Sequence, residues 1–502
     1  MFRSTCLLFL LATTVAKGQQ PWVFTHGQPG RDALVSDMIW TNNGLVLTCY
    51  YADPPFHPPY SGSLIRISSS GSFIDERSLG STLNHSAPSV VLSGPDQRLH
   101  VLGAYSEFPD SLSGFFHYGC SVDGSLEDSS FNIAANARRT LLENATFLDD
   151  GSIILGGSLS YEVNGSIKYA QLLKLNNDGQ VITDNTFGMS GMHIQYTRDV
   201  VPFSDGVLVS FDEWPQPPGL YGRFSSNLDF DAQWYGQAPH YNPLNPLDSI
   251  VKGAMTLRPL NDRKYIVGGA FKIPNDQYSS AVYVMDTSGA TLKAFVPHSP
   301  YYHDHSALQS TIASIDTNTF YFLSWGNISF WGDWIPYEPI EPDVLHVYKM
   351  DNDLNVLCDF LLDGFEDSTY YIPVRIKTTP DGGFAIIGGK KDMTDPTSNI
   401  VAWVQTFSPN DCTVGIETQE DSRSALVFPN PGSSGFDVLL NGQGLTAGQI
   451  VVIDTRGVQV AEGWMEGTTG RVDCSDLPDG LYLYRILDRN GHPYASGRWV
   501  KQ

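Results

Sequence analysis

The sequence predicts an all-β chain, and three observations indicate it. A short apolar strand that follows a polar turn recurs seven times, at intervals of 53–64 residues. Each copy is followed by a second strand–turn–strand unit, and no segment between the copies has the apolar period of a helix. This pattern stops near residue 417 and the composition changes after residue 424. About four short strands per period are typical of a propeller blade, so we expect a seven-bladed β-propeller followed by a small C-terminal β-sandwich.

The strands of each blade can be assigned in order. The strands after the first turns begin at Gly44, Arg98, Gly151, Gly206, Arg263, Thr319 and Gly383. The second hairpins begin at Leu64, Phe115, Gln171, Leu220, Ala281, Val344 and Ile400. Their turns are rich in Asp, Asn, Ser and Gly, which tolerate the backbone conformations of tight connections. The innermost strands are expected in the apolar stretches before the first turns, such as 34–40 and 141–147.

Stacking of the blades explains the apolar middle strands. A four-stranded sheet cannot bury both faces alone, and the segments 153–155 and 385–387 are apolar at every position. Such rings often close by adding an N-terminal strand to the last blade. The segment 22–27 resembles the outer strands elsewhere, and 413–417 is a competitor within the blade itself.

The N-terminus has the pattern of a secretory signal peptide. Arg3 precedes the apolar run 7–11, and small residues at Ala16 and Gly18 precede an expected cut before Gln19. The run is too short to span a bilayer, and we expect no membrane span elsewhere. The resulting division is a signal peptide at 1–18, a propeller at 19–417, a linker at 418–424 and a C-terminal domain at 425–502.

The net charge and the cysteine content limit the kinds of ligand and partner that the chain could bind. The chain has 30 basic and 54 acidic residues, a net charge of −24, which disfavours nucleic acid because phosphate recognition needs clustered Lys and Arg. After loss of Cys6 with the leader, five cysteines remain, without metal-ligand spacing. Cys358 and Cys412 could pair, although the sequence favours buried free thiols.

The C-terminal domain carries a family resemblance. The segments 428–431 (FPNP), 454–457 (DTRG), 477–482 (LPDGLY) and 497–501 (GRWVK) resemble, in order and spacing, the motifs of the C-terminal sorting domain of the Bacteroidetes type IX secretion system. The motif residues are Pro429, Asn430, Pro431, Asp454, Gly457, Gly480, Tyr482 and Lys501. Trp499 and Gln502 depart mildly from the usual pattern. The blades also resemble repeats of secreted cargo proteins, most clearly at 380–389.

The resemblance implies export in two steps. The leader would direct the chain to the periplasm, and the type IX secretion machinery, as partner, would recognise the C-terminal domain for passage through the outer membrane. In that family the domain is usually cleaved, and the cargo is released or attached to the surface. We therefore expect a secreted or outer-membrane-surface protein.

Aromatic residues mark one face of the ring as the candidate binding surface. In an antiparallel meander, loops between second and third strands share a face with the inter-blade loops, which we call the loop-rich face. Aromatics held by proline suit stacking on sugars or gripping a protein loop. The candidate ligand-binding residues are Tyr51, Phe56, Tyr60, Trp214, Trp234, Trp331, Trp334, Tyr301 and His303. Packing of these loops against one another is the alternative.

The sequence provides no catalytic residues that we would name. It lacks a Gly-x-Ser-x-Gly elbow, a His-Glu-x-x-His pair and a phosphate loop. Carboxylate pairs such as Asp212 with Glu213 fit solvated turns, and the histidine-rich loop at 297–305 lacks an identifiable fourth metal ligand. We expect no metal and no cofactor.

These features favour a surface binding module for a glycan or protein ligand, more readily than an enzyme. An extracellular polysaccharide-degrading enzyme, with its site on the loop-rich face, is the second hypothesis. A structural or adhesive surface protein is the third, because the propeller fold alone names no activity.

Overall fold

The computed structural model describes most of the propeller region and of the C-terminal domain. The described residues are 21–54, 57–79, 84–107, 112–133, 137, 139–160, 169–187, 194–213, 220–237, 250–261, 263–273, 277–287, 290–297, 304–326, 342–395, 397–409, 425–440, 448–454, 458–489 and 493–502. The expected signal peptide lies outside them and stays a prediction. The chain divides into two compact units, Met1–Thr413 and Val414–Gln502.

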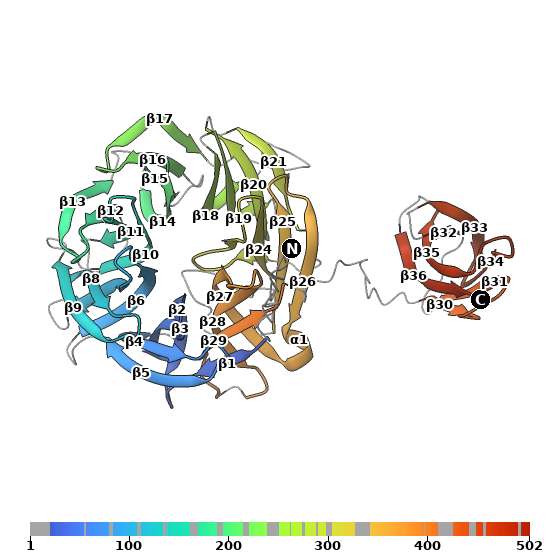
Figure 1. Ribbon diagram of the computed structural model, residues 1–502, viewed down its shortest axis with the longest axis horizontal. Helices are drawn as coiled ribbons and strands as arrows, with labels where there is room; N and C mark the ends of the chain where they lie inside the picture. The colour runs from blue at the N-terminus through green and yellow to red at the C-terminus, as the bar shows by residue number, and fades with distance from the viewer. Residues whose placement is uncertain are drawn as a thin grey trace, which may run out of the picture. The chain divides into compact units, whose positions relative to one another are not determined.

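The first unit is a seven-bladed ring of antiparallel sheets, as predicted (Figure 1). Blade 1 contains β2 (Asp32–Thr41), β3 (Gly44–Asp53), β4 (His57–Ile67) and β5 (Phe73–Leu79). Blade 2 contains β6 (Asn84–Ser93), β7 (Leu99–Glu107), β8 (Leu112–Cys120) and β9 (Leu126–Ile133). Blade 3 contains β10 (Arg139–Phe147), β11 (Ile153–Ser160), β12 (Tyr169–Leu175) and β13 (Val181–Phe187). Blade 4 contains β14 (Ile194–Phe203), β15 (Gly206–Glu213), β16 (Leu220–Ser225) and β17 (Phe230–Gln237).

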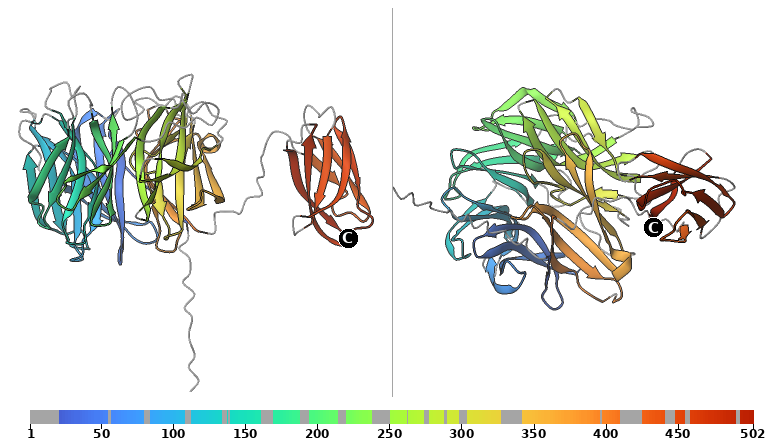
Figure 2. Two further views of the ribbon diagram at one scale, coloured as in Figure 1. Left: turned by 90° about the horizontal axis from the view of Figure 1, so that it is seen from above. Right: turned by 45° about the vertical axis from the view of Figure 1, so that its right-hand side comes forward.

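The remaining blades depart slightly from this plan. Blade 5 contains β18 (Ile250–Asn261), β19 (Lys264–Ile273), β20 (Gln277–Asp286) and β21 (Thr291–Phe295). In blade 6 the innermost position is shared by β22 (Asp304–Ser306) and β23 (Ile312–Ser314), followed by β24 (Thr319–Gly326), β25 (Val344–Asp351) and β26 (Val356–Asp363). The short helix α1 (Gly364–Asp367) leads into blade 7, which contains β27 (Thr369–Thr378), β28 (Phe384–Asp392) and β29 (Val401–Phe407). Strands run between the two faces of the ring, so the connections gather at those faces (Figure 2).

The N-terminal strand closes the ring. β1 (Val23–His26) pairs antiparallel with β29, with Val23 opposite Gln405 and His26 opposite Ala402. This confirms the segment 22–27 as the fourth strand of blade 7. The competing segment 413–417 lies outside the described residues.

The core of the ring lies between the blades. Among the described residues, seven apolar clusters bridge the seven pairs of neighbouring blades. The middle strands are buried on both faces, as the stretches 153–155 and 385–387 show with every residue fully buried. Burial of both faces removes the polar alternation of a solvent-facing strand, which explains the continuous apolar runs in the sequence.

The innermost strands share a bulge that the sequence did not reveal. Six of them shift register at the same level, opposite the middle of the neighbouring strand. The shifts fall between Val35 and Asp37, Pro88 and Val90, Leu142 and Asn144, Thr197 and Asp199, Ala254 and Thr256, and Pro373 and Arg375. In blade 6 the innermost strand is interrupted between β22 and β23 instead. We call this level the bulge layer.

The second unit is a small all-β domain. Its strands are β30 (Ala425–Phe428), β31 (Gly435–Leu440), β32 (Gly448–Ile453), β33 (Gln459–Glu466), β34 (Thr469–Asp473), β35 (Gly480–Asp488) and β36 (Pro493–Lys501). They form one sheet in the order β30-β31-β34-β33-β32-β35-β36. The sheet folds around a core that includes Phe436, Ile450 and Trp499, and a bridge between Gly432 and Lys501 joins its two ends.

One cysteine expectation needs correction. Cys358 is disulfide-bonded, with a partner outside the described residues, whereas Cys49, Cys120 and Cys474 are free and buried. A disulfide fits an oxidising compartment. No helix within the described segments is long and apolar enough to cross a membrane.

Candidate functional site: a pocket at the seam of the ring

The centre of the ring is closed at the bulge layer by Arg375. This residue of blade 7 is 3% exposed. Its guanidinium donates to backbone oxygens of blades 1, 2 and 3 and to a side chain of blade 6. The acceptors are Ser36 O (3.0 Å), Ser89 O (3.4 Å), Glu143 O (2.8 Å), Asn144 Oδ1 (3.4 Å) and Gln309 Oε1 (3.0 Å). Arg375 therefore joins five blades through one side chain.

Other polar groups of the bulge layer connect neighbouring blades. Asp37 Oδ2 accepts from Val91 N of blade 2 (2.9 Å). Asp199 Oδ2 accepts from Leu257 N of blade 5 (2.7 Å), and Thr256 Oγ1 accepts from Thr311 N of blade 6 (2.8 Å). Burial raises the pKa of Asp199 to about 6 although these donors oppose the shift. The Asp37 and Asp199 carboxylates accept hydrogen bonds that join the blades. Their position near the ring centre is therefore no evidence of catalysis.

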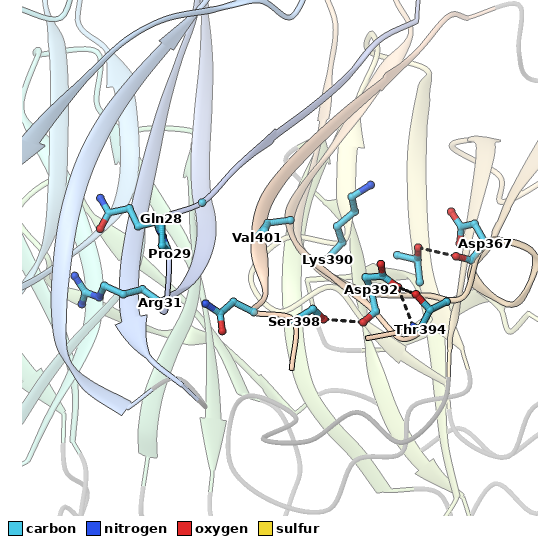
Figure 3. Close-up of a pocket in the computed structure, with 12 residues that line it drawn as sticks. Gln28, Pro29, Arg31, Asp367, Lys390, Asp392, Thr394, Ser398 and Val401 are labelled. Atoms are coloured by element: carbon cyan, nitrogen blue, oxygen red, sulfur yellow. Dashed lines mark hydrogen bonds between the residues drawn. The ribbon is translucent and has the colours of Figure 1, made fainter. Parts of the chain in front are cut away.

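The loop-rich face carries an open pocket where blade 7 meets blade 1, which we call the seam pocket. It has a volume of about 730 Å³, within the range of small-ligand sites. Figure 3 shows that its residues come from three connections: the link between β1 and β2, α1 with the start of β27, and the β28–β29 hairpin. The lining residues are Gly27, Gln28, Pro29, Arg31, Asp367, Thr369, Lys390, Asp392, Thr394, Ser398, Asn399 and Val401.

A tight turn forms the first wall. Arg31 N donates to Gln28 O (3.1 Å), and Gly30 has a φ of +74°. Pro at the second position and Gly with positive φ at the third are typical of a type II turn, so the sequence QPGR specifies this shape. The Arg31 guanidinium is fixed by Ser61 Oγ (2.7 Å) and Tyr51 O (3.0 Å).

Side-chain to backbone bonds fix the hairpin wall. Asp392 Oδ1 accepts from Thr394 N (2.8 Å) and Thr394 Oγ1 (2.6 Å), and Ser398 Oγ donates to Asp392 O (2.7 Å). With its amide oriented to suit the surrounding donors, the Asn399 oxygen accepts from Gly30 N (3.0 Å) and Arg31 N (2.9 Å). This joins the hairpin to the first wall and leaves the Asn399 NH2 group unused by these bonds.

The third wall, formed by α1 and the start of β27, is held by hydrogen bonds at the two ends of α1. Asp363 accepts from Phe365 N (2.9 Å) at the start of α1, and Tyr371 Oη donates to Asp367 Oδ2 (3.1 Å). Met393 N donates to Ser368 O (2.8 Å), which ties this wall to the hairpin. Hydrogen bonds among its own side chains and backbone thus hold the pocket in shape.

The structure places the predicted ligand-binding residues in different environments. Tyr51 is fully buried in the core between blades 1 and 7, and its hydroxyl donates to Glu76 Oε1 (2.8 Å), which corrects the expectation that it faces a ligand. Tyr60 is half-buried and packs edge-on against Tyr50. The Trp234 side chain lies outside the described part of the chain. The residues Phe56, Trp214, Tyr301, His303, Trp331 and Trp334 also lie outside it.

Two buried histidines of blade 2 form a pair with a structural role. His100 Nδ1 and His117 Nε2 lie 2.9 Å apart within blade 2, and both residues are fully buried. Burial lowers the pKa of His117 to about 4, so the pair is neutral at pH 7. In the described stretches, no three His, Cys, Asp or Glu residues are placed to hold a metal.

In the C-terminal domain, the motif residues hold the last strand. Asn430 bonds to Arg498 O (2.9 Å) and Val500 N (3.0 Å), and Trp499 Nε1 donates to Pro429 O (3.0 Å). Lys501 Nζ is buried and donates to the carbonyls of Cys474 (2.8 Å), Ser475 (2.6 Å) and Leu477 (2.5 Å). The basic ending thus has a structural role in closing the sheet.

The other motif residues stabilise turns and edges. Tyr482 Oη donates to Pro478 O (2.7 Å), and Asp454 Oδ1 accepts from Val458 N (3.0 Å). Gly480 pairs with Lys501 across the last two strands. Pro431 immediately precedes the Gly432 bridge, and Gly457 lies outside the described residues.

Comparison with known proteins identifies the C-terminal domain. Residues 426–498 match the secretion system C-terminal sorting domain. This confirms the sequence resemblance and export through the type IX system to the cell surface or the medium. The chain is not matched by any curated protein.

Solved structures support only a general likeness. A Dyadobacter fermentans protein of unknown function has 12% identity and a TM-score of 0.39, covering 62% of this chain and 95% of that one. A putative 6-phosphogluconolactonase from Bacteroides fragilis has 11% identity and a TM-score of 0.38, covering 68% and 85%. A puromycin-hydrolysing peptidase from Mycobacterium tuberculosis has 10% identity and a TM-score of 0.40, covering 81% and 58%. Likenesses this weak carry no argument about activity.

Proposed function

We propose that the propeller is an extracellular carbohydrate-binding module, exported by its sorting domain, and that it binds through the seam pocket. One observation carries the proposal: the pocket is an open space of ligand size whose walls are held by backbone bonds and lined by polar side chains. Amide, hydroxyl and carboxylate groups together can donate to and accept from the hydroxyls of a sugar.

The seam pocket suits binding better than the ring centre does. The carboxylates of the bulge layer bond to backbone amides, and Arg375 occupies the space between the blades. Ser398, Asn399 and Gln28, in contrast, line a pocket that is open to solvent. Pre-formed walls also reduce the ordering cost of binding.

A glycan array probed with the full propeller tests the proposal. We expect capture of one or more oligosaccharides, and loss of capture in Gln28→Trp, which places an indole in the pocket. Asn43→Trp, in a turn on the opposite face of the ring, is the matched control and should bind as the parent does. The proposal fails if no glycan is captured, or if a folded Gln28→Trp variant retains full capture.

A further inference from the structure

The seam pocket contains one charged group that forms no hydrogen bond within the described residues. Four lining residues carry charge: Arg31, Asp367, Lys390 and Asp392. Arg31 bonds to blade 1, Asp367 accepts from Tyr371, and Asp392 accepts from Thr394. Over the described part of the chain, the Lys390 ammonium forms no hydrogen bond and has no carboxylate oxygen within 4 Å.

Its position keeps Lys390 in the pocket. Lys390 lies on β28, near the end of the strand, and pairs with Tyr371 on one side and Val401 on the other. Figure 3 shows its side chain extending between the hairpin wall and Asp367, with its nitrogen directed away from Asp392. Lys391, the next residue, is not part of the lining, because successive side chains of a strand point to opposite sides.

On this basis, and resting on the proposed carbohydrate function, we infer that the pocket selects a sugar that carries a carboxylate, which Lys390 binds. The Lys390 charge interacts with Asp392 over a distance, but its partly buried ammonium forms no hydrogen bond within the described residues, so it can donate a charge-assisted hydrogen bond to an anionic ligand group. The hydroxyls of the same sugar would meet Ser398, Asn399 and Gln28. The ligand class is therefore a uronic acid unit of an extracellular polysaccharide.

The remaining charges favour a single carboxylate over a more anionic group. Hydrogen bonds from Thr394 lower the pKa of Asp392, so this wall stays negative at pH 7. The chain as a whole carries a net charge of −24. The two cations and two anions of the lining cancel, so a phosphate dianion or a polysulfated chain would add more uncompensated negative charge to the pocket than a single carboxylate does.

Binding of matched acid and ester probes tests the inference. The probes are trimers of galacturonic, glucuronic and mannuronic acid and their methyl esters, which keep the sugar and remove the charge. We expect the parent to bind at least one acid about tenfold more tightly than its ester, and to lose most of this preference between 0.05 and 0.5 M salt. Lys390→Met should abolish the preference, and Lys391→Met should keep it.

The outcomes separate the two proposals. Equal binding of an acid and its ester, or an acid preference that survives in Lys390→Met, overturns the carboxylate inference and leaves carbohydrate binding standing. Capture of neutral glycans alone, blocked by Gln28→Trp, has the same meaning. Failure of the parent to bind any probe or any arrayed glycan removes both proposals. Thermal unfolding of each variant verifies that it is folded.

Discussion

The bulge layer and the seam pocket both gather charged residues at junctions between blades, yet they use them in opposite ways. In the bulge layer, Arg375 and Asp199 are buried and bonded to backbone groups of other blades. In the seam pocket, hydrogen bonds of side chains and backbone shape the walls, and the Lys390 ammonium forms no hydrogen bond among the described residues. A charged residue near the axis of a propeller is therefore no guide to its binding site, because such a residue can be fully occupied by bonds that join the blades.

Replacing Arg375 should produce the largest effect. Arg375→Met leaves several backbone oxygens buried without their donor and removes an ion pair to Asp37, so we expect the free energy of unfolding of the ring to fall by about 3–5 kcal/mol. Chemical denaturation measures this. Arg223→Met, which removes an ion pair to the exposed Asp205, is the control and should cost under about 1 kcal/mol. Similar losses in both variants would contradict the bonded role of the bulge layer.

Asp199 should give the bulge layer a pH signature. Burial raises its folded-state pKa from 3.8 to about 6, so the folded ring binds this proton more readily than the unfolded chain. Its contribution to stability therefore decreases as the pH rises from about 4 to 6 and is constant above, a change of about 2–3 kcal/mol. The difference in unfolding free energy between the parent and Asp199→Asn should follow this course. A pH-independent difference would count against it.

Glu76 should give the seam beside the pocket the opposite signature. His26 of β1 and Tyr51 of blade 1 both bond to Glu76, at 3.0 and 2.8 Å. Burial would raise its pKa, but hydrogen bonds from Tyr51, His26 and Ser63 lower it on balance. Its stabilisation is therefore present above pH 4.5 and lost as the pH falls through the lowered pKa.

Glu76→Gln tests that sign. We expect a loss of about 1 kcal/mol in unfolding free energy at pH 7, which shrinks as the pH falls below 4.5 and through the lowered pKa of Glu76. Glu366→Gln, at an exposed position on α1, is the control and should change the unfolding free energy at pH 7 by less than about 0.5 kcal/mol. A Glu76→Gln penalty that grows on acidification would be incompatible with the seam bonds.

Substitutions of the pocket's open charges should affect stability least. Lys390→Met removes no bond within the described structure, so its unfolding free energy should stay within about 0.5 kcal/mol of the parent. Denaturation curves measured beside the binding assays check this. A loss as large as that of Arg375→Met would show that Lys390 is structural and would erase the contrast between the two regions.

Strand pattern made the ring predictable, because stacked blades need apolar middle strands and tight polar turns. The same pattern identified β1 as a strand, and pairing with β29 confirmed its role. The sorting motifs were readable because they combine Pro, Gly and aromatic residues at fixed spacing. The exact domain bounds and the signal peptide remain predictions.

The site was less accessible to sequence reasoning. Tyr51 was misjudged because β3 is buried on both faces, so alternation gives no sign of which side is exposed. At three of the bulges an Asp or Asn (Asp37, Asn144 or Asp199) interrupts the apolar strand and accepts from the next backbone N–H, and this polar position was the available signal. The seam pocket joins segments near residues 28, 367 and 390, which only ring closure brings together. The turns QPGR and DMT were the available local signals.

Closure of the ring by β1 has a consequence for proteolytic removal of the C-terminal domain. Because the outermost place in blade 7 is filled from the beginning of the chain, no described strand of the ring follows Phe407. A protease that cuts the chain beyond blade 7 would therefore remove the sorting domain without breaking any strand pairing of the ring. Because the N-terminal strand β1 closes the ring, removal of the C-terminal domain would leave the strand pairing of the propeller intact.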